Sequence, residues 1–287
     1  MRRELVIFAA ILAVVLVVGL FGRSLMLDIA VREIKSAFPG YDVSVGSVEI
    51  RNADMFALLD IRAKKGDTLL YRIKSVEINF SPLSLFTRTV PKITIKNGSL
   101  EFNSPDKKLK EIIEYPAPKP GKGFIARSVV ISNLTVAVNT ADWRFTAETG
   151  GNLTLGKEIT YKVDINMNDF NLAFLPKGLD AAEKMDIKGK MTGSLFLRGE
   201  NMKITEIKGD FSTTPPGGKL VIKDEEFLKK LAENTKQPLS VIEEGFKNYD
   251  FTEGTLRVSR NADSILLHIM LDGAKGKRDI TVALYNF

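Results

Sequence analysis

Few residues in this chain could carry out covalent or redox chemistry. The sequence has 287 residues, no cysteine and one histidine, His268. Without cysteine there are no disulfides, no thiolate nucleophiles and no zinc sites with cysteine ligands. A lone histidine excludes metal sites that need several histidines, and it argues against a histidine-based catalytic centre. His268 falls on the polar phase of an alternating segment, so we expect it to face solvent on a strand.

A run of three acidic residues is the other candidate for chemistry. Asp224, Glu225 and Glu226 precede an apolar pattern with helical spacing. The helix dipole favours acidic residues in a first turn, which explains the run without a metal, and a metal site is the alternative. The chain contains no nucleophile elbow, P-loop, H-E-x-x-H motif or Gly-rich dinucleotide fingerprint. We therefore expect no catalytic residues, no metal and no cofactor, and a protein that is not an enzyme.

The charge is mildly basic and spread along the chain. Lys and Arg number 41 and Asp and Glu 35, a formal net charge of +6. The densest basic groups are Lys107-Lys108-Lys110 and Lys275-Gly276-Lys277-Arg278, and neither alternates with aromatic residues as a nucleic-acid platform does. We expect solvated loops there, with anionic lipid headgroups as the alternative contact, and no nucleic-acid partner.

An apolar run near the N-terminal end predicts the location of the protein. It extends from Leu5 to Phe21, 17 positions, or roughly 26 Å of helix, near the lower limit for crossing a bilayer. Arg2 and Arg3 precede it, which places the N-terminus in the cytoplasm and the rest outside. We expect residues 1–22 to be an uncleaved single-pass anchor in a bacterial inner membrane with the body in the periplasm, and a cleaved signal peptide is the alternative. The anchor candidates are Leu5, Phe8, Ile11, Val15 and Phe21.

Beyond an amphipathic helix expected at residues 23–39, the apolar period changes from 3.6 to 2. This period predicts a mainly β fold, a long curved antiparallel meander in which each strand has one apolar face. Segments such as KITIKNGSLEF (Lys92 to Phe102) and SVVISNLTVAV (Ser128 to Val138) suggest hairpins that turn at Asn-Gly or similar pairs. The apolar positions that we expect to line a groove are Val76, Ile78, Phe80, Ile93, Ile95, Leu134, Val136, Val138, Tyr161, Val163, Ile165, Leu195, Leu197, Ile265, Leu267 and Ile269.

Composition divides the body into four parts. A first strand segment covers residues 40–103, a Pro-rich loop or linker residues 104–123, and a β meander residues 124–212. The last part, residues 213–287, contains a helical insert at about 224–247. There Phe227, Leu228 and Leu231 are predicted to share one helix face, and Val241, Ile242, Gly245 and Phe246 follow at helical spacing.

The order of these patterns resembles a known family. GSVEI (Gly46 to Ile50), FALLDIRA (Phe56 to Ala63) and SVEINFSPLSLFTRTVPKITIKNGSLEF (Ser75 to Phe102) look like the N-terminal module of AsmA-like proteins. GDFSTTPPGGKLVI (Gly209 to Ile222) and the segment Gly245 to Phe287 are similar to the closing domain of the YdbH branch of that family.

The resemblance implies a membrane-anchored periplasmic protein whose curved sheet forms an apolar groove for phospholipid acyl chains travelling between the inner and outer membranes. Expected partners are therefore phospholipid acyl chains, the inner membrane, and an outer-membrane or periplasmic protein or further copies of this chain. The alternative is an envelope scaffold or outer-membrane assembly factor that carries no lipid. Periodicity alone does not separate an open groove from a sealed core.

Overall fold

A computed structural model describes Arg32, residues 42–52, 54–65 and 68–79, Ser84, Thr87, and residues 89–109, 125–178, 182–201, 203–261 and 263–285. Of the described residues, 70% lie in strands and 13% in helices, which confirms the predicted mainly β fold with a short helical part near the C-terminal end. The predicted anchor, the predicted amphipathic helix apart from Arg32, and Phe80 lie outside the described residues. Within the described ranges, no helix combines the length and the apolar character that a bilayer crossing requires.

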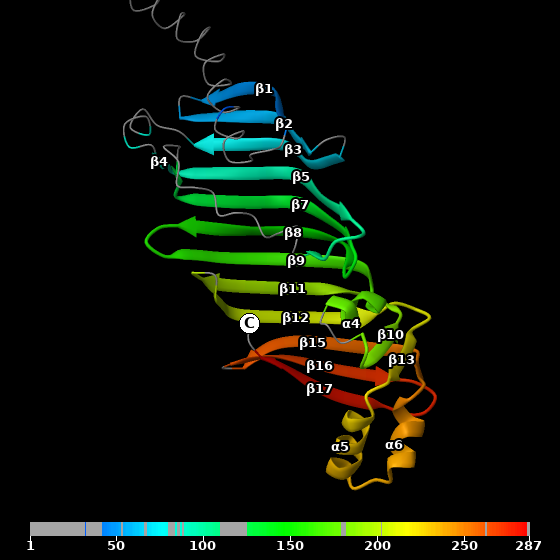
Figure 1. The fold of residues 1–287 in the computed structure, drawn as a ribbon. Helices are drawn as coiled ribbons and strands as arrows, with labels where there is room; N and C mark the ends of the chain where they lie inside the picture. Colours follow the sequence, from blue (N-terminus) through cyan, green and yellow to red (C-terminus); the bar gives the residue numbers. More distant parts are fainter. Residues whose placement is uncertain are drawn as a thin grey trace, which may run out of the picture. The chain divides into compact units, whose positions relative to one another are not determined.

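Twelve strands form one sheet in the order β1-β2-β3-β5-β7-β8-β9-β11-β12-β15-β16-β17 (Figure 1). Neighbours in this order are mostly neighbours in sequence and pair antiparallel, so the sheet is the predicted meander. Its strands are β1 (Asp42–Asn52), β2 (Met55–Lys65), β3 (Thr68–Asn79), β5 (Lys92–Ser104), β7 (Ser128–Thr140), β8 (Arg144–Leu155), β9 (Ile159–Asn171), β11 (Lys190–Glu200), β12 (Lys203–Thr213), β15 (Glu253–Asn261), β16 (Ser264–Asp272) and β17 (Arg278–Tyr285).

The remaining strands form two small sheets. β10 (Met185–Lys188), β13 (Gly218–Ile222) and β14 (Tyr249–Phe251) make a three-stranded sheet. β4 (Thr89–Val90) and β6 (Ile125–Ala126) pair in parallel. The helices are η1 (Leu172–Phe174), α4 (Leu175–Gly178), α5 (Glu225–Thr235) and α6 (Leu239–Phe246).

The chain divides into two compact units. Unit 1 contains residues 1–101 and 116–134, and unit 2 contains residues 102–115 and 135–287. The buried residues of unit 1 include one cluster on β1, β2 and β3, formed by Val48, Leu58, Ile61 and Val76.

The strands of unit 1 keep one apolar face in spite of a break in the two-residue period. Val45 and Val48 on β1 contribute to the same core although three positions separate them. The same three-residue step joins Leu58 to Ile61 on β2 and Ile73 to Val76 on β3. The steps line up, because the pairings place Leu59 opposite both Ser47 and Ser75.

Left-handed residues occur at this break in the period on β2, β5 and β7. Asp60, Asn97 and Asn133 have φ angles of 52°, 51° and 55°, a conformation that Asp and Asn adopt more readily than most residues. The Nδ2 group of Asn133 donates a hydrogen bond of 3.4 Å to Oδ1 of Asn97. One additional residue at this row turns the strand without moving its apolar side chains to the other face. Figure 1 shows such a bend in β5.

The prediction that Asn97-Gly98 and Asn133 form hairpin turns is therefore wrong. Asn97 lies inside the 13-residue strand β5, and Asn133 inside the 13-residue strand β7. A left-handed Asn fits a bulge within a strand as well as a two-residue turn, and the sequence pattern is the same for both.

Unit 2 has a second layer over part of its large sheet. The small sheet β10-β13-β14 and helices α5 and α6 contribute buried side chains to a common core with strands β9, β11, β12, β15 and β16. Figure 1 shows β10 and β13 in front of the right-hand ends of β12 and β15. The buried members of this core are Phe170, Leu172, Ile187, Met191, Phe211, Leu220, Ile222, Leu228, Ala232, Ile242, Phe246, Tyr249, Phe251, Leu256, Leu267 and Leu271.

Helix α5 begins at the predicted acidic run. The side chain of Asp224 is the N-cap and accepts a 3.0 Å hydrogen bond from the backbone N–H of Phe227, while Glu225 and Glu226 occupy the first turn. The structural interpretation of the three acids is confirmed. Phe227 and Val241 were predicted on apolar helix faces, but they are 38% and 52% exposed, because their neighbours Leu228 and Ile242 turn into the core instead.

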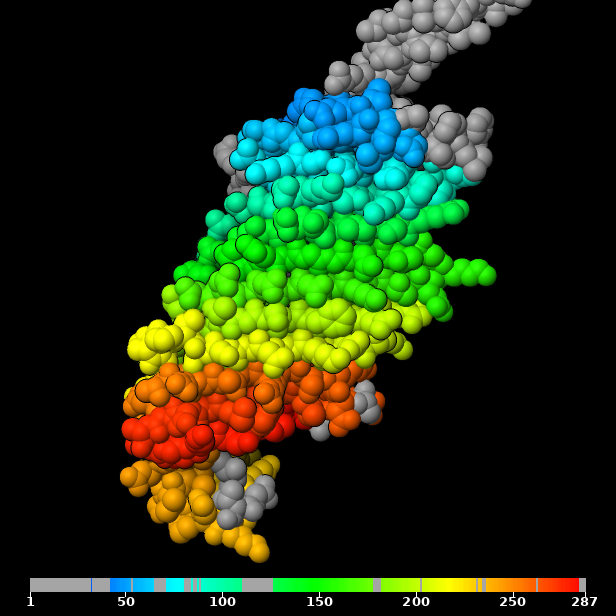
Figure 2. All heavy atoms as spheres, turned by 180° about the vertical axis from the view of Figure 1, so that it is seen from behind, coloured from blue at the N-terminus to red at the C-terminus, as the bar shows by residue number. Residues whose placement is uncertain are grey.

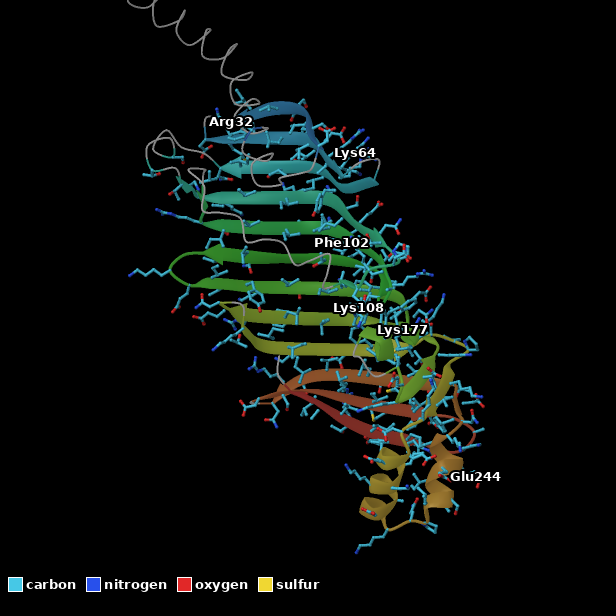
Figure 3. All side chains as sticks on the ribbon, viewed as in Figure 1. Arg32, Lys64, Phe102, Lys108, Lys177 and Glu244 are labelled. Atoms are coloured by element: carbon cyan, nitrogen blue, oxygen red, sulfur yellow. The ribbon has the colours of Figure 1, made fainter. Side chains whose placement is uncertain are left out.

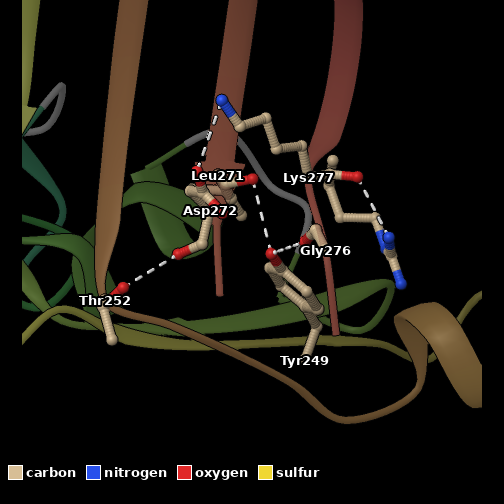
Figure 4. Close-up of polar contacts among 7 residues, drawn as sticks. Tyr249, Thr252, Leu271, Asp272, Gly276 and Lys277 are labelled. Atoms are coloured by element: carbon tan, nitrogen blue, oxygen red, sulfur yellow. Dashed lines mark hydrogen bonds and ion pairs between the residues drawn. The ribbon is translucent and has the colours of Figure 1, made fainter. Parts of the chain in front are cut away.

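Tyr249 joins the small sheet to the β16–β17 hairpin. Its side chain is fully buried, and its hydroxyl lies within hydrogen-bond distance of the carbonyl oxygens of Leu271 (3.4 Å) and Gly276 (Figure 4). The guanidinium of Arg278 stacks 4.8 Å from the Tyr249 ring centroid and 5.2 Å from that of Phe246. Burial raises the pKa of the Tyr249 hydroxyl above its usual value.

Candidate functional site

The apolar face of unit 2 is built from cross-strand rows of side chains. Successive residues of a strand point to opposite faces, and directly paired residues on neighbouring strands share a face. The central row crosses seven strands, a span of about 29 Å at about 4.8 Å per strand. Its members, in order from β8 to β17, are Thr149, Ile165, Leu195, Gly209, Val258, Leu267 and Val282.

Parallel rows flank the central row on both sides. One contains Gly151, Val163, Leu197 and Ile207, and the next contains Leu153, Tyr161, Gly199 and Ile204. On the other side lies the row Ala147, Met167, Gly193, Phe211, Leu256, Ile269 and Ile280. The alternation predicted from the sequence thus produces a two-dimensional apolar surface.

The opposite face of the same strands is polar and charged. Glu206 on β12 pairs with Lys208 at 2.6 Å and with Arg198 at 3.9 Å. The hydrogen bond from Lys208 lowers the pKa of the Glu206 carboxyl. On β16, His268 is partly exposed, with Nε2 2.7 Å from Oδ1 of Asp279, on the polar face where the alternation placed it. Figure 2 shows this side of the molecule, on which the small sheet does not cover strands β8 to β12.

The second layer covers only part of the apolar face. Phe211, Leu256 and Leu267 are buried in the core beneath the small sheet and its helices. Toward the other end of the strands, Tyr161, Val163 and Leu197 remain half-buried and belong to neither core cluster. Ile165, at the centre of the face, is likewise half-buried and outside both clusters.

The predicted groove residues therefore fall into three groups. Four are buried, namely Val76, Leu134, Val138 and Leu267. Six are half-buried and pack against a core cluster, namely Ile78, Ile93, Ile95, Leu195, Ile265 and Ile269. Five are half-buried and outside both clusters, namely Val136, Tyr161, Val163, Ile165 and Leu197.

We define the open apolar face as Tyr161, Val163, Ile165 and Leu197 on the adjacent strands β9 and β11. Leu153 on β8 extends it by register, the buried Ile207 on β12 continues the row of Val163 and Leu197, and the sequence reasoning missed both. The sequence does contain a signal for Leu153, because this apolar residue alternates with the polar residues Asn152 and Thr154, both of which are exposed.

Small residues interrupt the rows and shape the surface. The ring of Tyr161 lies over Gly199, where an added Cβ would collide with Cζ and Oη of the tyrosine. In the same way Phe211 lies over Gly193. The aromatic rings therefore lie along the sheet and cover backbone that would otherwise be exposed.

Three aromatic side chains lie beside the second layer, beyond the row of Ala147 and Met167 that borders the open apolar face. The ring centroids of Trp143, Phe145 and Phe170 are 6.2 to 6.4 Å apart in tilted and edge-on arrangements. Next to them, the ring of Phe174 on η1 carries the guanidinium of Arg144 at 5.5 Å and the ammonium of Lys177 at 5.2 Å. Sequence reasoning did not identify this aromatic and basic group, because its members come from different elements.

Within the described residues, no three His, Cys, Asp or Glu side chains gather in a way that could hold a metal ion. No protein-family model matches the chain, and no curated protein matches it.

Proposed function

We propose that this protein binds phospholipid acyl chains on the open apolar face and takes part in phospholipid transport between bacterial membranes. One observation carries the proposal: Tyr161, Val163, Ile165 and Leu197 form adjoining rows of half-exposed apolar side chains that neither core cluster covers. Such surface on a stable protein marks a binding site more often than chance exposure.

The open apolar face accommodates part of an acyl chain. With Leu153 it crosses β8, β9 and β11, about 10 Å at about 4.8 Å per strand, against about 15 Å for the hydrocarbon of one leaflet. Each methylene that moves from water onto apolar surface contributes about 0.8 kcal/mol, so a chain of many methylenes gains from every row it crosses. The charged opposite face keeps the other side of the sheet in water.

The location and the wider role rest on the sequence. The apolar run from Leu5 to Phe21 with the preceding Arg2 and Arg3 supports a single-pass inner-membrane anchor and a periplasmic body. The resemblance to AsmA-like proteins of the YdbH branch supports phospholipids as cargo and the outer membrane as destination.

Site-specific photo-crosslinking tests the proposal. A photoreactive phenylalanine analogue at Val163 in the full-length chain, incubated with phospholipid vesicles, is expected to yield a lipid adduct detectable by mass spectrometry. The matched control is the same analogue at Asn166, which is exposed on the opposite face of β9. Equal adduct yields at the two positions, or none at Val163, would overturn lipid binding on this face.

A second variant connects the adduct to the apolar row. Ile165→Asp places a carboxylate on β9, two residues from Val163 and on the same face. The adduct yield at Val163 is expected to fall at least fivefold, because covering a charged carboxylate with hydrocarbon costs its hydration. Asn166→Asp adds the same charge to the other face and should leave the yield unchanged. Circular dichroism of both variants establishes that the sheet is retained.

A further inference from the structure

Two basic side chains share one aromatic ring at the end of the apolar surface next to the second layer. Arg144, the first residue of β8, and Lys177, on α4, lie 5.5 and 5.2 Å from the centroid of Phe174. Both are exposed, and Figure 3 shows Lys177 near the right-hand ends of the strands.

The described residues supply no carboxylate to either cation. Nε of Arg144 donates to Oδ1 of Asn139 at 2.9 Å, a neutral partner. The nearby carboxylate of Asp142 accepts hydrogen bonds from the backbone N–H of Leu109 and the hydroxyl of Thr140, at 2.9 and 2.8 Å. Among the described residues, neither cation thus forms an ion pair, although the Asp142 carboxylate lies two positions from Arg144 in the sequence, and an anion bound between the two cations would be attracted to both.

The basic pair adjoins the apolar face. Phe145 follows Arg144 and points to the apolar side of β8, where it stacks with Trp143 and Phe170. From Phe145 the same side of the strand passes the buried Ala147 and reaches Thr149, about 13 Å along, where the half-buried Ile165 lies directly opposite. That distance is shorter than the hydrocarbon of one leaflet, about 15 Å.

From this geometry we propose that Arg144 and Lys177 bind the phosphate of an anionic phospholipid headgroup whose acyl chain lies on the open apolar face. The guanidinium presents a planar set of N–H donors to phosphate oxygens, and the ammonium adds a point charge. An aromatic group between the charged and apolar parts matches the preference of Trp at membrane interfaces. This inference rests on the proposed lipid binding and specifies its substrate class.

The test uses the crosslinker at Val163 in the full-length chain with vesicles of equal phosphatidylglycerol and phosphatidylcholine. Mass spectrometry of the adduct measures the ratio of the two lipids. We expect phosphatidylglycerol to be enriched at least threefold, and R144Q/K177Q to return the ratio to about one while the total adduct yield stays within twofold. The control K162Q/K203Q removes two charges from exposed lysines elsewhere and should keep the enrichment.

The outcomes separate the two proposals. Adducts whose composition is the same in the wild type and in R144Q/K177Q would overturn the headgroup site and leave acyl binding intact, whereas absence of any adduct would overturn acyl binding itself. Inorganic phosphate at 20 mM, added at constant ionic strength, tests the source of the phosphate. Retained enrichment supports a lipid headgroup, and loss of enrichment would show that the site takes free phosphate instead.

Discussion

Tyr161 on β9 and Gly199 on β11 are direct register partners, and the tyrosine ring occupies the space that a side chain at position 199 would fill. Gly199→Ala forces the ring or the strand to move, because the new Cβ would also meet the carbonyl oxygen of Lys203. Overpacking of this kind costs about 1 to 3 kcal/mol of the free energy of unfolding. Urea denaturation of the full-length chain measures it.

A matched control exists for this substitution. An alanine Cβ at Gly156 would meet only the carbonyl oxygen of Glu158, at 3.6 Å, so Gly156→Ala should change the free energy of unfolding little. The cost of Gly199→Ala should also shrink in a Tyr161→Ala background. An equal cost in both backgrounds would contradict the packing of the ring over the glycine.

The Tyr249 hydroxyl provides a second prediction. Tyr249→Phe leaves the carbonyl oxygens of Leu271 and Gly276 without this buried donor, so unfolding should become easier by about 1 to 2 kcal/mol. Thr252→Val removes a similar contact, 3.3 Å to the carbonyl of Asp272, from an exposed position and should cost less than about 0.5 kcal/mol. Thermal denaturation monitored by circular dichroism compares the two variants. Equal losses of stability would argue against a stabilising buried hydrogen bond from the Tyr249 hydroxyl.

The same residue predicts a loss of stability at alkaline pH. The folded-state pKa of Tyr249 is raised above the ordinary value of 10.0, chiefly by burial, so the folded protein holds its proton more tightly than the unfolded chain does. Its contribution is complete below pH 10 and declines as the pH rises through the folded-state pKa. The melting temperature of the wild type should therefore fall more steeply above pH 10 than that of Tyr249→Phe. If the melting temperatures of the two proteins fell in parallel as the pH rose, this would contradict the raised pKa of Tyr249.

The left-handed Asn97 supports a fourth prediction. Asn97→Val places a β-branched residue at a φ of 51° and should lower the free energy of unfolding by about 1 to 2 kcal/mol. Asn97→Gly loses the hydrogen bond from Asn133, but glycine adopts the left-handed conformation without strain. This variant should therefore lower the free energy of unfolding clearly less than Asn97→Val does. Comparison of the urea midpoints checks this, and similar losses in the two variants would mean that the amide contact dominates over the backbone conformation.

The sequence predicted the fold class well because period-2 alternation is a local signal. Val163 and Ile165 alternate with Lys162 and Asp164, and their strand lies where the pattern places it. The pattern failed at Asn97 and Asn133, where the local sequence is the same for a turn and for a bulge. The choice between them depends on pairing with neighbouring strands, which a single strand does not encode.

Alternation also could not separate covered from uncovered positions. Leu267 and Ile165 share the central row and look alike in sequence, yet only Leu267 is buried. The difference arises because the insert between β12 and β15 folds back over one part of the face. The group around Phe174 was missed for a related reason, since Arg144 and Lys177 are far apart in sequence and meet only through the tertiary fold.

The meander has a consequence for how such a protein changes over evolutionary time. Most strands of the large sheet bond only to strands adjacent in sequence, so a duplicated hairpin can be accommodated without new partners for the strands on either side. Each duplication lengthens the sheet by about 10 Å and, if its alternation is kept in phase, extends every apolar row by two side chains. The reach of this surface is thus a quantity that gene duplication can adjust in steps, while the layer formed by the insert between β12 and β15 is unaffected.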